Sequence, residues 1–224
     1  MEKYADYIKE IEIDSLWSGT RHIVWRLHKQ VNVLSGVNGM GKSTILNRVV
    51  KCLPKGGDTN QAHVKGVRIT MAPEDATCVR YDIIRSFDRP LLNAEIIAKL
   101  GLSIATELDF QLYQLQRRYL DYQVDIGNRI ISALQSGVPD AARLAQAHNE
   151  PKRLFQDMID RLFAETGKTI IRSENEVRFA QIGETLQPYQ LSSGEKQLLV
   201  VLLTVLVEDQ RSYVLFMDEP EVSM

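Results

Sequence analysis

Apolar residues recur with two different periods along this chain. Residues 7–13 and 22–27 read as short strands, and in residues 67–71 apolar and polar side chains alternate, which is typical of a strand that buries one face. From residue 93 onward the spacing becomes helical, and a stripe spaced by fours and threes predicts one long helix over 103–134. This stripe comprises Leu108, Leu112, Leu115, Tyr119, Tyr122 and Ile126.

A second amphipathic helix is predicted after Pro151, with Gly167 as its end. Its apolar face comprises Leu154, Phe155, Met158, Ile159, Leu162 and Phe163. Residues 168–172 and 177–180 then predict a hairpin. These patterns predict an α/β fold with a mixed or parallel sheet, N-terminal β-strands and an inserted helical lobe. The predicted boundaries are 1–89 for the first part of the α/β domain, 90–166 for the lobe, and 167–224 for the rest of the α/β domain.

A glycine-rich loop lies between a short β-prone run at 31–34 and a segment with helical spacing at 45–53. The loop fits the phosphate-binding (Walker A) pattern G-x-x-x-x-G-K-[ST] without a mismatch, and the order strand, loop, helix is the one that this pattern requires. It predicts a P-loop nucleotide site formed by Gly36, Asn38, Gly39, Gly41, Lys42, Ser43 and Thr44.

The chemistry of phosphate binding explains these residue types. Glycines let the backbone curl so that its N–H groups point at the phosphates, and the helix N-terminus adds positive potential. Lys42 is expected to reach the β- and γ-phosphates and to assist catalysis, and the Ser43 hydroxyl is expected to ligate Mg²⁺. The alternative, a glycine turn with a surface lysine, does not explain the flanking strand and helix.

A continuous apolar run at 213–217 predicts a buried strand of a parallel sheet, and it ends in two carboxylates. Ligands bind at this end of strands in open α/β sheets. Asp218 is therefore the candidate Mg²⁺ (Walker B) residue, and Glu219 is the candidate general base that activates water. An ordinary strand-ending turn is the alternative, but the phosphate loop favours the ATPase interpretation.

The segment 191–197 reads LSSGEKQ and precedes an apolar helix. Together with the GVNGMGKST loop and the later FMDEP run, it resembles the signature motif of the ATP-binding-cassette superfamily of ATPases. The resemblance implies that Ser192, Gly194 and Glu195 meet the ATP held by a partner, so that two copies form an ATP-dependent homodimer. A serine at a helix N-terminus is also an ordinary helix cap, and the two roles are compatible.

The ending at 218–224, DEPEVSM, resembles the RecF, chromosome-maintenance and OLD-type nuclease branch of AAA-type ATP-binding proteins. The glutamate at Glu195 favours the same branch. The resemblance implies an ATP-hydrolysing switch in DNA repair, DNA maintenance or anti-phage defence, with a nuclease or a nucleic acid as a candidate partner. Two alternatives stay open: a scaffold that ATP assembles without needing hydrolysis, and the ATPase subunit of a membrane transporter.

The sequence departs from the cassette pattern in two places. The segment 78–88, where the family carries a glutamine, offers only Ser86 and Asp88, to which we assign no metal role. The chain also ends before the strand that supplies the family's switch histidine, since His22, His28, His63 and His148 all precede the signature segment. We therefore expect a chain that is truncated at its C-terminus.

Composition adds a few limits. The formal net charge of −2 over 224 residues gives no bulk signal for nucleic-acid binding. Cys52 and Cys78 are isolated and lack metal-ligand spacing, as expected for reduced structural thiols. No signal peptide is recognisable, and the longest apolar run, 198–207, is too short to cross a bilayer. These features predict a cytoplasmic protein without membrane insertion.

Overall fold

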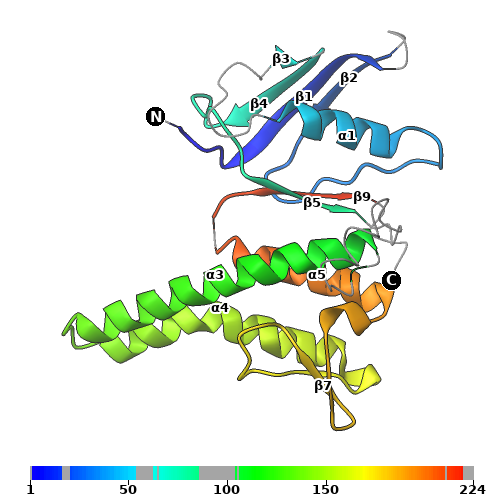
Figure 1. Ribbon diagram of the computed structural model, residues 1–224. Helices are drawn as coiled ribbons and strands as arrows, with labels where there is room; N and C mark the ends of the chain where they lie inside the picture. The colour runs from blue at the N-terminus through cyan, green and yellow to red at the C-terminus, as the bar shows by residue number, and fades with distance from the viewer. Residues whose placement is uncertain are drawn as a thin grey trace. The chain divides into compact units, whose positions relative to one another are not determined.

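The structure is a computed structural model that describes residues 2–16, 21–53, 63–64, 66–85, 104, 106–209 and 211–218. The chain divides into two compact units, which we call unit 1 (residues 1–84 and 211–218) and unit 2 (residues 85–210 and 219–224). Figure 1 labels most of their helices and strands. The segment 167–210 belongs to unit 2 together with the predicted lobe, whereas the sequence boundaries place it with the phosphate loop.

Unit 1 contains a four-stranded antiparallel sheet in the order β2-β1-β4-β3. The strands are β1 (Tyr7–Leu16), β2 (Arg21–Arg26), β3 (His63–Val64) and β4 (Val67–Ala72). The three segments predicted as strands therefore form β1, β2 and β4, and β1 extends three residues beyond its predicted end at 13. Helix α1 (Lys42–Cys52) follows the phosphate loop and buries Ile45, Val49 and Cys52 in the same core as this sheet.

Two register shifts keep the apolar residues of β1 on one face. Ile8, Ile11, Ile13 and Leu16 are all buried, although strict alternation would turn some of them to solvent. The pairing shifts between Ile8 and Glu10 on the β4 side and between Ile13 and Leu16 on the β2 side. Each shift absorbs one extra residue, so the strand can bury every member of the set.

The segment 31–34 is not a strand in the structure, contrary to the prediction from its β-prone residues. Val31 and Val33 are 75% and 80% exposed. The Asn32 side chain accepts a hydrogen bond from the His28 backbone N–H (2.7 Å) and donates one to the His28 carbonyl (2.8 Å). These local bonds satisfy the backbone of a turn and compete with pairing in a sheet.

Strand β9 (Val214–Asp218) forms where the apolar run predicts it, and it pairs with β5 (Tyr81–Arg85). The prediction of a fully buried central strand is wrong, since only Phe216 of β9 is buried. Within the described residues β9 has one strand neighbour, so its other edge is not covered by a strand. The Phe216 ring meets Tyr81 of β5 edge to face, with centroids 6.3 Å apart.

In its described residues, unit 2 is built on three α-helices: α3 (Glu107–Gln135), α4 (Ala141–Leu162) and α5 (Ser193–Val207). Helices α3 and α4 run side by side as a hairpin, and α5 also packs on α3 (Figure 1). All six residues of the stripe predicted on α3 are buried. Helix α3 begins at a capping box in which the Thr106 hydroxyl accepts from the Asp109 N–H and the Asp109 carboxylate accepts from the Thr106 N–H.

Helix α4 begins ten residues before Pro151, so the prediction of a start after this proline is wrong. Proline inside a helix removes one backbone hydrogen bond, a cost that the long apolar hairpin with α3 offsets. The predicted apolar face is correct only in part. Phe155, Ile159 and Phe163 are buried, whereas the other three members, Leu154, Met158 and Leu162, are about half exposed.

A small antiparallel sheet in the order β6-β7-β8 follows α4. Its strands are β6 (Thr169–Ile170), β7 (Phe179–Gln181) and β8 (Glu184–Leu186). The predicted hairpin is confirmed by the pairing of β6 with β7, and β8 is an additional strand that the sequence pattern did not indicate. The single-turn helices η1 (Ala164–Thr166) and η2 (Pro188–Gln190) flank this sheet.

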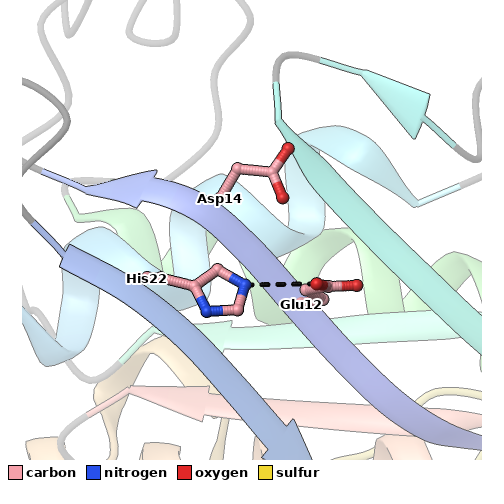
Figure 2. Close-up of side chains that lie close together, drawn as sticks. All are labelled: Glu12, Asp14 and His22. Atoms are coloured by element: carbon pink, nitrogen blue, oxygen red, sulfur yellow. Dashed lines mark hydrogen bonds and ion pairs between the residues drawn. The ribbon is translucent and has the colours of Figure 1, made fainter.

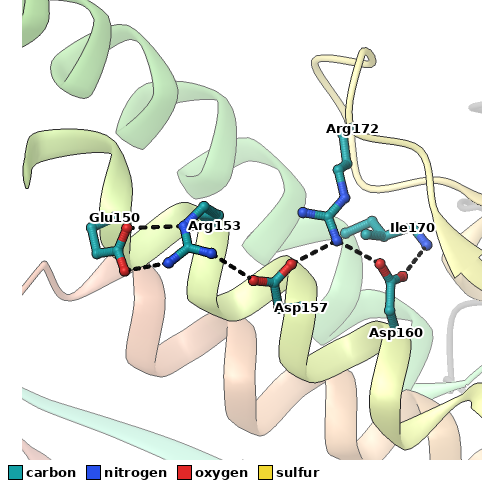
Figure 3. Close-up of polar contacts among 6 residues, drawn as sticks. All are labelled: Glu150, Arg153, Asp157, Asp160, Ile170 and Arg172. Atoms are coloured by element: carbon teal, nitrogen blue, oxygen red, sulfur yellow. Dashed lines mark hydrogen bonds and ion pairs between the residues drawn. The ribbon is translucent and has the colours of Figure 1, made fainter. Parts of the chain in front are cut away.

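Unit 2 contains both exposed and buried ion pairs. On the surface of α4, Arg153 contacts Glu150 and Asp157, and Arg172 contacts Asp157 and Asp160 (Figure 3). Asp160 also accepts the Ile170 N–H at 2.7 Å, which joins β6 to the helix. The solvent around such exposed pairs screens the charges, so each contributes little to stability.

A buried ion pair joins α3 to α5. Lys196 Nζ lies 2.8 Å from Asp109 Oδ1, and the two side chains are only 10% and 4% exposed. Because Asp109 also closes the cap of α3, this contact fixes the N-terminus of α3 against the first turn of α5. Burying both charges is costly, but leaving one of them buried alone costs more.

We predict that Lys196→Met lowers the free energy of unfolding of unit 2 by about 3 to 5 kcal/mol, because it leaves the Asp109 carboxylate buried without its cation. Urea unfolding monitored by the helical circular-dichroism signal measures this free energy, since the long helices α3, α4 and α5 lie in unit 2. The matched control is Arg153→Met, which removes an exposed cation and should cost less than about 1 kcal/mol. Equal losses for the two variants would contradict the assignment.

Candidate functional site

The phosphate loop ends at an open helix N-terminus. Gly39 and Gly41 both have φ of +84°, a left-handed conformation that side chains other than glycine rarely adopt. Gly41 is the N-cap of α1, and no side chain caps this end. The first turn contains no acidic residue either. The free N–H groups and the positive end of the helix dipole therefore make a site for an anion.

The ammonium group of Lys42 lies over this loop. Its Nζ donates to the Gly36 carbonyl at 2.7 Å and to the Val37 carbonyl at 3.4 Å. These are exchangeable neutral acceptors at the surface, and the phosphate oxygens of a nucleotide are stronger ones. The lysine is thus held at the loop that it is predicted to serve.

The two candidate Mg²⁺ residues meet although they are 175 residues apart in sequence. The Ser43 hydroxyl donates to Asp218 Oδ1 at 2.9 Å, which joins the start of α1 to the end of β9 within unit 1. Hydroxyl and carboxylate oxygens are the ligand types that Mg²⁺ prefers. The loop, Lys42, Ser43 and Asp218 together therefore fit a nucleotide triphosphate with its magnesium ion.

The signature segment forms the N-terminus of α5 in unit 2. Ser192 is the N-cap, and its hydroxyl accepts the Glu195 N–H at 3.3 Å. Ser192 and Ser193 are exposed and Gly194 is partly exposed, so this helix end is open to a ligand. The capping alternative is thus present in the structure, and it leaves the site accessible.

Glu195 is turned inward instead. Its Oε1 accepts from the Thr166 hydroxyl (2.8 Å) and from Lys168 Nζ (2.9 Å), and its Oε2 accepts the Ser192 N–H (2.9 Å). Burial alone would raise the pKa of Glu195, but the hydrogen bonds from Lys168, Ser192 and Thr166 outweigh it and lower the pKa. The carboxylate is therefore ionised and fully engaged within its own chain.

The structure places the predicted residues in two groups. Unit 1 brings together the phosphate loop, Ser43 and Asp218, and unit 2 carries the signature segment. Glu219, Ser86 and Asp88 lie outside the described residues. Sequence reasoning missed Lys168 and Thr166 as supports of Glu195, because nothing in their spacing identifies a partner 27 to 29 residues away.

The predicted structural thiols are confirmed, since Cys52 and Cys78 are both buried and neither forms a disulfide. No helix within the described residues is long and apolar enough to cross a bilayer.

Two arginines of α3 form ion pairs with acidic residues that follow α5. Arg118 pairs with Glu208, and Arg129 pairs with Asp209.

Comparison with known proteins identifies the family. The family model described as ABC transporter matches residues 26–222, which is most of the chain and includes the phosphate loop, the signature segment and Asp218. Searches of curated proteins and of solved structures gave no significant match. The match and the site geometry agree, and the chain therefore belongs to the ABC transporter family, whose domain is a P-loop ATPase that binds and hydrolyses ATP.

Proposed function

We propose that this ATPase works as a homodimeric switch in which each ATP, with Mg²⁺, lies between unit 1 of one copy and the signature helix of the other. The observation that carries the proposal is the state of the α5 N-terminus. Ser192 is exposed and neutral, while the nearby acidic group, Glu195, is bonded inward. A helix N-terminus cleared of negative charge suits the γ-phosphate of a second molecule.

Each group on the phosphate side has a distinct task. The backbone N–H groups from Gly36 to Thr44 hold the phosphates, and Lys42 moves from its carbonyl contacts to the β- and γ-phosphate oxygens. Ser43 and Asp218 hold the Mg²⁺ ion, which neutralises charge that develops on the phosphates. Lys42 assists catalysis by stabilising the same charge.

Glu219 is the proposed general base. It follows Asp218, the last residue of β9, directly in sequence. A carboxylate there can accept the proton of the attacking water.

On the opposite side of the dimer, Ser192 and Gly194 contact the partner's γ-phosphate. The contacts of Glu195 favour a positioning role over direct contact with ATP. Its bonds to Lys168 and Thr166 fix the first turn of α5, and so the direction in which Ser192 points. A carboxylate facing the triphosphate would instead repel it.

For the biological output we propose DNA repair, DNA maintenance or anti-phage defence, with a nuclease or a nucleic acid as partner. The LSSGEKQ and DEPEVSM runs support this choice. The description of the matching family favours a second candidate, the ATPase subunit of a transporter. Co-purification with a membrane protein would favour the transporter, and ATP turnover that responds to DNA or to a nuclease would favour the switch. A scaffold would dimerise on ATP without hydrolysing it.

We predict that Ser192→Asp abolishes ATP-dependent dimerisation while Ser192→Asn preserves it. Asp and Asn cap a helix as well as Ser does, so both variants should fold with the stability of the wild type. Only Asp places a negative charge against the partner's γ-phosphate, which should weaken dimerisation at least about a hundredfold. Light scattering after size-exclusion chromatography in ATP measures the mass. Dimerisation of the Asp variant at wild-type concentrations would contradict the proposal.

We also predict that Glu219→Gln slows ATP hydrolysis by about 10² to 10⁴, because the variant lacks the base but keeps its size and polarity. ATP binding should persist, and the ATP-bound dimer should accumulate. Single-turnover hydrolysis of bound ATP is the measurement, and Glu221→Gln, two residues further along, is the matched control with expected wild-type turnover. A Glu219→Gln variant that hydrolyses ATP at the normal rate would remove Glu219 as the base.

A further inference from the structure

Two carboxylates and an imidazole gather on the outer face of the unit 1 sheet (Figure 2). In the antiparallel pair of β1 and β2, Ile13 lies opposite Ile23. Ile13 is fully buried, and side chains alternate along a strand, so Glu12 and Asp14 on either side of it leave the opposite face. His22, next to Ile23, leaves the same face. One ligand atom from each of Glu12, Asp14 and His22 lies within 4.8 Å of the others.

We propose that Glu12, Asp14 and His22 bind a divalent transition-metal ion of the Zn²⁺ type. One imidazole nitrogen and two carboxylate oxygens are ligands that Zn²⁺ accepts, and water can complete the tetrahedron. Metal–ligand bonds of about 2.0 to 2.1 Å place two tetrahedral ligands about 3.3 Å apart. His22 Nε2 and Glu12 Oε1 are 3.1 Å apart, so this pair already has the required spacing.

A contact from outside the ligand set orients Glu12. Glu12 Oε2 accepts from Arg68 Nη1 at 2.6 Å, which orients the carboxylate and leaves Oε1 directed at His22. Hydrogen bonds of this kind from outside the ligand set are a regular feature of metal sites. Within the described part of the chain, no hydrogen bond or ion pair holds the Asp14 carboxylate, so its side chain can turn to the ion.

Charge also favours a cation. Two carboxylates lie close together here, and the Arg68 guanidinium binds that of Glu12. A dication between Glu12 and Asp14 would replace their mutual repulsion by two attractions. Coordination would also tie β1 to β2 beside the register shift between Ile13 and Leu16, so that binding should raise the melting temperature of the protein. The site is independent of the ATP site proposed above, which lies at α1 and β9.

Isothermal titration of the full chain with ZnCl₂, without nucleotide, tests the proposal, and the visible absorption of Co²⁺ reports its coordination. We expect saturable 1:1 binding and a rise in melting temperature. His22→Gln should weaken Zn²⁺ binding at least about tenfold, since it removes the only nitrogen ligand of the set. Asp14→Asn should weaken it as well.

Two controls exclude other sites. His148→Gln removes a histidine of α4 in unit 2, and Asp218→Asn alters the predicted Mg²⁺ site; neither should change Zn²⁺ binding. Absence of saturable binding by the wild type would overturn the proposal. So would wild-type affinity in His22→Gln, or loss of binding in either control.

Discussion

The hydrogen bond between Ser43 and Asp218 is the contact on which the ATP site depends. It connects the first turn of α1 with the last residue of β9, while the intervening chain forms most of unit 2. The phosphate loop and the carboxylate proposed to bind Mg²⁺ are therefore assembled only when unit 1 closes around both of its segments. Bringing these distant segments together costs chain entropy. Burial of the apolar core that α1, β9 and the antiparallel sheet share offsets this cost.

The signature helix depends on a second set of contacts, the buried pairs of its first turn. Glu195 is bonded to Lys168 and Thr166, and the next residue, Lys196, is bonded to Asp109 of α3. Buried ion pairs, which water screens little, thus fix the first turn of α5 that follows the exposed Ser192. A ligand at Ser192 would act on a rigid helix end, and any shift of that end would reach α3 directly.

The periodic patterns predicted much of this structure, and the exceptions have local causes. Strands β1, β2 and β4 of the antiparallel sheet, the stripe of α3 and the helix after the phosphate loop followed from the sequence pattern, whereas β3 was not predicted. The strand predicted at 31–34 does not form, because the Asn32 side chain bonds the N–H and the carbonyl of His28 in a local turn. Helix α4 continues through Pro151 because its partner helix compensates for one missing bond. Motif spacing predicted Lys42, Ser43 and Asp218 as site residues, and the fold brings Ser43 and Asp218 into contact. The contact of Lys168 with Glu195 could not be predicted, because it is set by tertiary packing.

The central claim, that one ATP site needs two chains, is tested most directly by mixing two inactive variants. Lys42→Ala removes the phosphate lysine but keeps the signature helix, and Ser192→Asp does the reverse. A mixed dimer has one intact site, so the account predicts ATP turnover in the mixture well above the sum of the two variants measured separately. Turnover no higher than that sum, with both variants folded, would contradict a site shared between two molecules.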